Sequence, residues 1–415
     1  MAIEDASVVI IGGGPSGATT GAALADAGVD VIILEKEEFP RFHTGEALTG
    51  TVGKLLRNMG LEDELNRDKH ALKDGAVVYG TKGKNSFTIP AVDINADGER
   101  VSVQTWQVKR DLFDKTLLDY ARGRGARVVQ AEALSPIQAD DGAVTGVRVR
   151  TPDGKEQDLT SRLLVDATGL GCFLHHAGVA GPKKRGAYHD QVVVWSHLTN
   201  TVRETPGDGF DTNTVLTYRR PLEWAWFIPI TPDITSVGVV IPTSYRKSFK
   251  EDTDAFFQRE LRELNPQLEC RVEGAEQIEP TIVTTGWSHQ IDEFTGPGWA
   301  CLADSHRFID PFFAFGVHLA MHESLKLASL TPEYLETGDP EVLDRFAQWA
   351  TAGLNNGQDL IDAFWNRPLA FGYLLQQEKY HDDLIDIFAG RIYDVAEPSP
   401  GHLKLRDLRY ADAET

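Results

Sequence analysis

The spacing of apolar residues changes several times along the chain, and each change marks a different predicted element. Short β-branched runs at residues 6–11 and 29–34 flank a helix-like segment at 19–26, so the chain is predicted to begin with a β-α-β unit. Further expected elements are a strand at 101–109, a helix at 112–124, strands within 128–149 and an apolar strand at 163–166.

A second pattern occupies the middle of the chain. Residues 191–242 are rich in β-branched and aromatic positions, as in VVVWSHL, EWAWFIPI and SVGVVIP, which is typical of a separate, mostly antiparallel sheet. Helical spacing returns at 317–330 and continues to about residue 393. The predicted fold is therefore α/β, with a Rossmann-like nucleotide-binding domain, a mostly antiparallel substrate-side sheet and a C-terminal helical region. Its expected boundaries are 1–180 with 285–330 for the nucleotide domain, including an inserted segment near 70–110, then 181–284 for the sheet and 331–415 for the helices.

Charge and cysteine content narrow the possible functions. The 415 residues carry 62 acidic and 41 basic side chains, a formal net charge of −21, which disfavours nucleic acid or an anionic membrane as partner and favours a small-molecule substrate. The first residues show no secretory signal, and no apolar run reaches membrane-spanning length. Cys172, Cys270 and Cys301 are too widely spaced to indicate a metal site or disulfides. We expect a soluble, cytoplasmic protein without a metal.

The first strand leads into GGGPSG, the fingerprint of a dinucleotide-binding turn. Gly12 permits a tight turn, Gly14 lets a pyrophosphate approach the backbone, and Gly17 allows close packing of helix on strand. Glu35 ends the second strand, where an acid accepts hydrogen bonds from the adenosine ribose. The predicted cofactor-binding residues of this unit are Gly12, Gly14, Pro15, Ser16, Gly17, Glu35 and Lys36. This pattern alone leaves FAD and NAD open. No second fingerprint of equal quality occurs, so the electrons are expected to come from outside the chain.

The hexad Trp224-Ala225-Trp226-Phe227-Ile228-Pro229 narrows the function further. It has the form WxWxIP and resembles the signature of the flavin-dependent halogenases, within the larger family of FAD-containing aromatic hydroxylases. Two tryptophans at i and i+2 on a strand face the same side. An ordinary aromatic core strand is the simpler interpretation of the two tryptophans alone. The resemblance implies FAD as the cofactor and assigns Trp224 and Trp226 to a wall that separates the flavin from the substrate.

Two further segments resemble flavin-binding parts of the same family. The run FPRFHTGEAL, residues 39–48, resembles the loop beside the isoalloxazine ring and adds Arg41, Thr44 and Glu46 as expected FAD contacts, although related reductases carry similar loops. The run QVKRDLFD resembles a segment whose arginine, here Arg110, lies near the flavin pyrophosphate. The run DATG at 166–169 resembles a strand end near the nucleotide.

Lys73 is the candidate catalytic residue. It lies in HALKDGAVVYG, at the position where similar halogenases place an active-site lysine ahead of a glycine and an aromatic residue. A lone lysine is more often a solvated surface charge. The hexad, found in the same chain, favours the catalytic interpretation.

The run ADSHRFIDPFFAFGVHLA, residues 303–320, resembles the family segment at the flavin edge. It implies that Asp304 accepts a hydrogen bond from the ribityl chain and that residues 311–316 form a turn that binds halide mainly through backbone N–H groups. Ala303 replaces the usual glycine, and Ala314-Phe315 replace small hydroxylated residues, which leaves the identity of the halide open. The expected contacts of this segment are Asp304, Pro311, Phe315, Gly316 and Val317.

The resemblance implies a complete reaction. Halide, chloride or bromide, would be oxidised to hypohalous acid through a flavin C4a-hydroperoxide, and Lys73 would hold the product by hydrogen bonding or as a haloamine for transfer to an electron-rich phenol or pyrrole. A separate NAD(P)H-dependent flavin reductase would supply the reduced FAD. Some relatives use substrates tethered to acidic carrier proteins, which suits a −21 chain poorly. We therefore expect a free aromatic substrate, with a carrier-tethered one as the alternative. An FAD-dependent monooxygenase without halide chemistry is the second interpretation.

Overall fold

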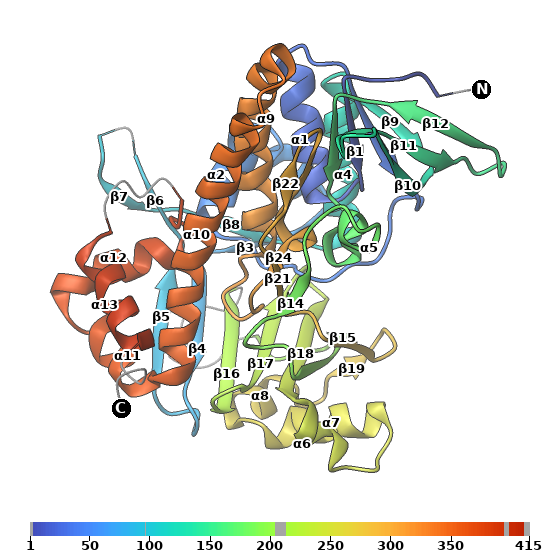
Figure 1. The fold of residues 1–415 in the computed structure, drawn as a ribbon. Helices are drawn as coiled ribbons and strands as arrows, with labels where there is room; N and C mark the ends of the chain where they lie inside the picture. The colour runs from blue at the N-terminus through green and yellow to red at the C-terminus, as the bar shows by residue number, and fades with distance from the viewer. Residues whose placement is uncertain (1–2, 96, 204–212, 394–397, 411–415) are drawn as a thin grey trace.

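The computed structural model describes residues 3–95, 97–203, 213–393 and 398–410, and it builds them around two large sheets (Figure 1). The first sheet has the strand order β22-β23-β13-β1-β2-β9 and is parallel except for the β22–β23 pair. Its strands are β1 (Val8–Ile11), β2 (Val31–Glu35), β9 (Arg127–Gln130), β13 (Leu163–Asp166), β22 (Thr295–Gly296) and β23 (Trp299–Cys301). The central strands are buried along their whole length, which is expected where a parallel sheet is covered on both faces.

Helices and a small sheet provide this cover. Helix α1 packs against both α4 and α9, and strand β11 of a three-stranded antiparallel sheet contacts β13. The elements involved are α1 (Pro15–Asp26), α4 (Arg110–Gly123), α9 (Gly316–Thr337), β10 (Glu132–Gln138), β11 (Val144–Arg150) and β12 (Glu156–Thr160). Figure 1 shows α1 and α9 side by side at the top of the molecule.

The second sheet has the order β19-β15-β18-β17-β16-β4-β5, with β20 also paired to β15. Every pair is antiparallel except β16–β4. Its strands are β4 (Gly75–Tyr79), β5 (Ser86–Pro90), β15 (Gln191–Thr199), β16 (Thr214–Arg220), β17 (Glu223–Pro229), β18 (Thr235–Pro242), β19 (Glu276–Gln277) and β20 (Ile282–Thr285). The segment near 70–110 thus contributes two strands to this sheet.

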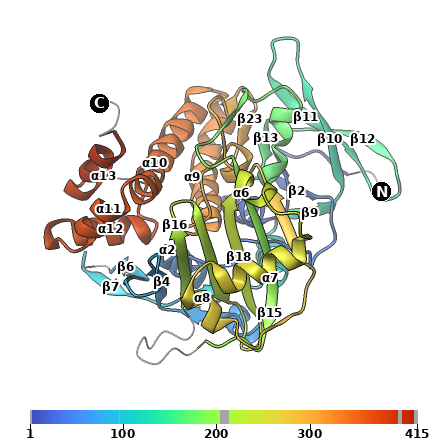
Figure 2. The ribbon, with the colours of Figure 1, turned by 90° about the horizontal axis from the view of Figure 1, so that it is seen from below.

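Alternation along β17 divides the second sheet into two apolar faces. Trp224, Trp226 and Ile228 belong to the core that faces the C-terminal helices, whereas Ala225 and Phe227 belong to a separate core. The second core is completed by three helices, α6 (Thr243–Lys247), α7 (Thr253–Glu263) and α8 (Pro266–Arg271). Figure 2 shows α7 and α8 lying across the strands on this side. The two tryptophans share one face, as the i, i+2 spacing predicts.

The C-terminal helices pack beside the two sheets. Helix α10 contacts α9 and α13, and α12 contacts α13 (Figure 1). These helices are α10 (Glu341–Asn366), α11 (Pro368–Leu375), α12 (Glu378–Phe388) and α13 (Pro400–Tyr410). The remaining elements are α2 (Gly50–Asn58), α3 (Glu62–Arg67), α5 (Phe173–His176), β3 (Ala71–Lys73), β6 (Val92–Ile94), β7 (Arg100–Ser102), β8 (Thr105–Gln107), β14 (Lys183–Arg185), β21 (His289–Ile291), β24 (Arg307–Phe308) and short 3₁₀ turns at Gly169–Gly171 and Ala303–Ser305.

The predicted α/β fold class is confirmed, with differences in detail. Helix α1 begins at Pro15 rather than near residue 19, because proline fits the first helical position, where an N–H has no partner to lose. The strand predicted at 101–109 is divided into β7 and β8, which pair with different strands, β6 and β3. Helix α9 continues seven residues beyond 330, through Pro332. Among the described residues, no helix is both long and apolar enough to cross a membrane.

Candidate active site

The glycine-rich turn connects β1 to α1 at the carboxyl end of the first sheet. Gly12 has a φ of +104°, and a Cβ atom there would lie 2.5 Å from the carbonyl oxygen of Ala167. A Cβ atom on Gly17 would overlap the carbonyl oxygen of Gly12. Gly14 caps α1 in an extended conformation, and Pro15 takes the first helical position. The unpaired N–H groups of the first helical turn can therefore receive an anion such as a pyrophosphate.

Glu35 ties the end of β2 to this turn. One carboxylate oxygen accepts a hydrogen bond from the N–H of Gly13 at 2.7 Å, and the other accepts from the N–H of Glu37 at 2.8 Å. The buried carboxylate thus lies at the turn, where the sequence predicts the adenosine ribose. Lys36 is exposed and is not among the described residues that line the neighbouring cavity.

A cavity of about 360 Å³ extends from this helix start to the beginning of α9. It brings together most of the predicted cofactor and wall residues: Gly14, Pro15, Ser16, Arg41, Thr44, Glu46, Arg110, Trp224, Trp226, Asp304, Pro311, Phe315, Gly316 and Val317. The DATG segment contributes its last three residues to the same lining.

Two arginines supply positive charge to the cavity. Arg110 donates to both carboxylate oxygens of Asp114, at 2.6 and 2.9 Å, and also to the backbone carbonyl of Thr44. Arg41 lies 3.8 Å from the same carboxylate. Asp114 is completely buried, so it holds both guanidinium groups near the wall of the cavity. Glu46, on the same loop, is paired with the buried His197 at 2.8 Å.

Asp304 lies in the 3₁₀ turn that follows β23. Burial raises the pKa of its carboxyl to about 7, while Arg110 lowers it and Glu323 raises it further. The preceding Ala303 has a φ of +49°, a region that favours glycine, and its N–H donates to the Glu323 carboxylate at 2.7 Å. The fold therefore accepts alanine at this position and holds it with a buried hydrogen bond.

Residues of the turn at 311–316 line the cavity, where the N–H of Phe312 donates to the Asp310 side chain and the N–H of Ala314 donates to the Pro311 carbonyl. Ala314 has a φ of +58° and is followed by Phe315 in a right-handed conformation at the start of α9. Successive residues of opposite hand orient their N–H groups into an anion-binding concavity. The Phe315 ring packs near Phe313 and His318. The Ala314-Phe315 departure thus leaves a backbone geometry that suits a halide.

The two tryptophans of the hexad form part of the cavity wall. Their ring centroids are 5.9 Å apart, and the rings of Trp224 and Phe312 meet in a T-shaped arrangement with centroids 4.8 Å apart. The Trp226 indole N–H donates to Ser236 at 3.0 Å. The Trp224 indole N–H is buried and has no acceptor among the described residues.

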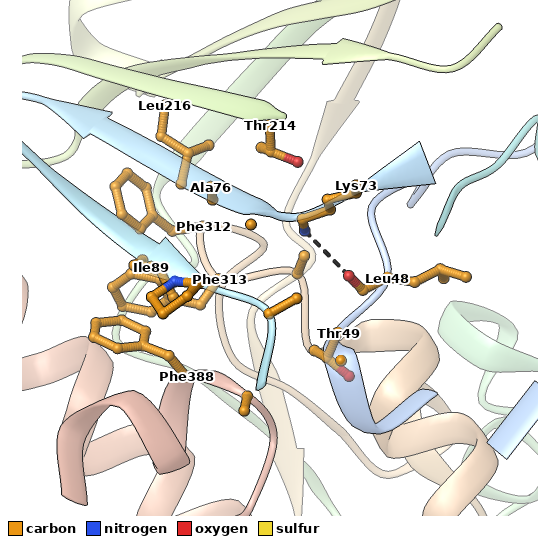
Figure 3. A pocket seen from close by; sticks show the side chains of 16 residues that line it. Leu48, Thr49, Lys73, Ala76, Ile89, Thr214, Leu216, Phe312, Phe313 and Phe388 are labelled. Atoms are coloured by element: carbon orange, nitrogen blue, oxygen red, sulfur yellow. Dashed lines mark hydrogen bonds between the residues drawn. The ribbon is translucent and has the colours of Figure 1, made fainter. Parts of the chain in front are cut away.

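Lys73 lies outside this cavity, at the end of β3 in a second, smaller pocket of about 40 Å³ (Figure 3). Its Nζ donates to the backbone carbonyl of Leu48 at 3.1 Å, and no carboxylate among the described residues forms an ion pair with it. Burial lowers the pKa of the lysine to about 8. The rings of Phe312, Phe313 and Phe388 gather on the other side of the pocket.

The pocket and the cavity share a wall. Thr214, Leu216, Phe312 and Ala314 line both spaces. Phe312 and Phe313 lie in the 311–316 turn that the sequence assigns to halide binding, but neither Thr214 nor Phe388 was a candidate. No local motif indicates Thr214 or Phe388, because they reach the pocket only through pairing of β4 with β16 and packing of α12.

Comparisons with known proteins show the family of this chain. Residues 5–354 match the family described as FAD binding domain. Over 93% of its length the chain is 35% identical to the 1H-pyrrole-2-carbonyl-[peptidyl-carrier protein] brominase of Pseudoalteromonas luteoviolacea, of which 92% is covered. The corresponding chlorinase of Pseudomonas fluorescens is 26% identical over 95% of this chain and 91% of its own length. The solved structure of the flavin-dependent brominase Bmp2 superposes with a TM-score of 0.92 at 32% identity, covering 99% of this chain and all of that one.

Proposed function

Because this chain belongs to the flavin-dependent halogenases, we propose that it halogenates a pyrrole carried as a carbonyl group on a peptidyl carrier protein, with Lys73 presenting the halogen to the ring. The names of the brominase and chlorinase relatives support this substrate over a free phenol. The observation that carries the role of Lys73 is its position: a buried lysine in a small apolar pocket that shares a wall with the FAD cavity.

The residues of the large cavity fit FAD. The start of α1, with Gly14 to Ser16, would hold the pyrophosphate and Asp304 the ribityl chain, since these residues line one cavity. Glu35 is outside this lining but is bonded to the N–H of Gly13 in the glycine turn, and it would hold the adenosine ribose. When bound, reduced FAD supplies two electrons and two protons, so that one dioxygen, one halide and one further proton give hypohalous acid and water while the flavin is oxidised. A separate NAD(P)H-dependent reductase would provide the reduced flavin.

The turn at residues 311–316 would hold the halide. Ala314 and Phe315 have opposite backbone hands, and α9 begins at the next residue, so the N–H groups of this turn favour an anion such as chloride or bromide. The tryptophans of β17 would wall off the flavin from the aromatic substrate, which would favour halogenation over direct hydroxylation.

Lys73 would act as a hydrogen-bond donor and acid toward hypohalous acid. Its ammonium group would hold the oxygen and protonate it as the halogen bonds to a ring carbon, so that the oxygen leaves as water. The ring then loses its proton, which returns the amine to its ammonium form. A lysine with a pKa of about 8 transfers a proton readily near neutral pH.

The test uses the purified protein with FAD, a flavin reductase, NADH and pyrrole-2-carbonyl carrier protein, in chloride, bromide or no halide. We expect halogenated pyrrole only with halide. Lys73→Met keeps the size of the side chain without its charge, and we expect product to fall at least ~100-fold, as for loss of a positioned acid. FAD affinity and flavin oxidation should stay near wild type.

Other outcomes would change the proposal. Hydroxylated product without halide would indicate a monooxygenase, and full activity of Lys73→Met would remove the lysine from the mechanism. Halogenation of free phenols, with none of the carrier-bound pyrrole, would restore the free-substrate prediction.

A further inference from the structure

Hypohalous acid formed in the FAD cavity must cross the shared wall to reach Lys73. Of the four residues that line both spaces, Leu216, Phe312 and Ala314 are apolar and Thr214 alone has a polar side chain. We propose that Thr214, fixed by Gln107, is the hydrogen-bonding station at which hypohalous acid passes from the flavin cavity to Lys73. This inference rests on the proposed function and adds a positioning pair to it.

The Thr214 hydroxyl is held in one orientation. Its Oγ1 donates to the side-chain oxygen of Gln107 at 2.5 Å, and both residues are buried. The Gln107 amide in turn donates to the backbone carbonyl of Pro229 at 2.8 Å. Pro229 ends the WxWxIP hexad, so the hydrogen-bond chain connects the flavin wall to the passage.

This orientation determines what the hydroxyl can bind. A threonine hydroxyl has one hydrogen to donate and two acceptor lone pairs. Because Gln107 takes the hydrogen, Thr214 is left as an acceptor toward the passage. Hypohalous acid has one O–H, which would otherwise lose its hydrogen bonds to water among Leu216, Phe312 and Ala314. An acceptor at this point offsets that loss.

The same segment is attached to the strand of the lysine. The side-chain oxygen of Asn213 accepts from the N–H groups of Asp74 and Gly75, each at 2.8 Å, directly after Lys73. Strand β8, which carries Gln107, pairs with β3, which carries Lys73. Thr214 and Lys73 therefore belong to one hydrogen-bonded unit and line the same pocket (Figure 3).

The chain offers a matched control on the same strand. Thr217 is buried on β16, but it pairs with Tyr79 and Ala225 on the other face of the sheet and lines neither space. Its hydroxyl has no partner among the described residues. Thr217→Val thus removes a buried hydroxyl from the same strand without touching the passage or the Gln107 hydrogen bond.

The experiment measures where the oxidised halogen goes. Wild type, Thr214→Val, Thr214→Ser and Thr217→Val are supplied with reduced flavin, bromide and carrier-bound pyrrole, in the presence of a bulky 1,3-diketone that traps free hypobromous acid. Halogenated pyrrole and halogenated trap are counted per flavin oxidised, and FAD affinity is measured by fluorescence.

We expect Thr214→Val to lower the pyrrole product per flavin by about three- to tenfold, as for loss of one hydrogen bond. The trapped halogen should rise by the missing amount, with FAD affinity unchanged. Thr214→Ser and Thr217→Val should match wild type within about twofold. The inference is overturned if Thr214→Val partitions halogen as Thr217→Val does, or if product falls without a rise in trapped halogen. If wild type halogenates neither pyrrole nor trap, the proposed function fails and this inference with it.

Discussion

The FAD cavity and the Lys73 pocket adjoin each other but are built in opposite ways. The cavity is about nine times larger, at about 360 against 40 Å³, and is lined by backbone turns, two arginines, two aspartates and a glutamate. The pocket is mostly apolar and holds one buried cation. The cavity is suited to binding a large charged cofactor through backbone N–H groups, whereas the pocket is suited to placing one proton donor beside a ring. In the proposed function, this difference would separate cofactor binding from halogen transfer.

The largest expected effect concerns the glycine turn, which both stabilises the fold and, in the proposed function, binds the pyrophosphate of FAD. Gly14→Ala places a methyl group 3.4 Å from the flexible Arg41 guanidinium, at a backbone conformation open to alanine. Apo-protein stability should change by less than ~1 kcal/mol, since nothing rigid is displaced. The methyl group would nevertheless block the pyrophosphate and cost at least two charged hydrogen bonds, so we expect FAD affinity to fall more than ~100-fold. Urea unfolding and flavin fluorescence titration measure the two quantities.

Gly17→Ala is the companion to this variant. Its methyl group would overlap the carbonyl oxygen of Gly12, so we expect the apo-protein itself to lose about 1–3 kcal/mol of its unfolding free energy, in addition to FAD affinity. If Gly14→Ala still binds FAD tightly, the pyrophosphate does not lie at the start of α1, and FAD occupies the cavity in another orientation.

The same contrast explains what the sequence could predict. The glycine turn and the tryptophan hexad are each one continuous stretch of sequence. The spacing of Gly12, Gly14 and Gly17 therefore predicts a turn, and the spacing of Trp224 and Trp226 predicts one face of a strand. Arg41, Arg110 and Asp304 line one cavity, as the family resemblance implied for each of them.

The Lys73 pocket could be predicted only as one residue. Leu48, Thr214, Phe313 and Phe388 come from four distant segments, and nothing in the local sequence of any of them indicates the others. Their meeting depends on the parallel β4–β16 pair, which no periodicity reports, and on how α12 packs. The sequence predicted one strand where the structure has β7 and β8. The pairing partners, β6 and β3, determine where each strand ends, and the local sequence does not indicate them.

An intermediate effect is expected from pH, because burial acts on the two regions with opposite sign. The pKa of Asp304 is raised to about 7, so the carboxylate that would accept from the ribityl chain is lost as pH falls below 7. The pKa of Lys73 is lowered to about 8, so its ammonium form is lost as pH rises above 8. We expect halogenation to peak between these values and to fall by up to tenfold per pH unit on the alkaline side.

Each limb of this profile can be removed separately. Saturating FAD should abolish the acid limb, since that limb reports affinity, and Asp304→Asn should remove the contribution of this carboxyl to the pH dependence of FAD affinity near 7. Lys73→Arg should flatten the alkaline limb, because a guanidinium stays protonated, even if the rate at pH 7.5 is lower. An alkaline limb that survives Lys73→Arg would show that another group titrates, and the contrast between the two regions would not explain the profile.

The smallest expected effect distinguishes the two tryptophans of the wall between the regions. Trp226→Phe leaves the buried Ser236 hydroxyl without its indole donor, while Trp224→Phe removes an N–H that has no acceptor among the described residues. Both variants remove the same atoms from buried positions, so their difference in unfolding free energy isolates the hydrogen bond, and we expect Trp226→Phe to be less stable by about 1 kcal/mol.

Trp224 also packs against Phe312, which lines both spaces, and its replacement should instead raise hydrogen peroxide release per flavin oxidised by two- to threefold, or about 0.5 kcal/mol. Urea unfolding and a peroxide assay on the same preparations make the comparison. Equal stability together with unchanged peroxide release would mean that the tryptophans are an ordinary aromatic core strand, and the separation of flavin from substrate would then rest on Phe312 and the 311–316 turn alone.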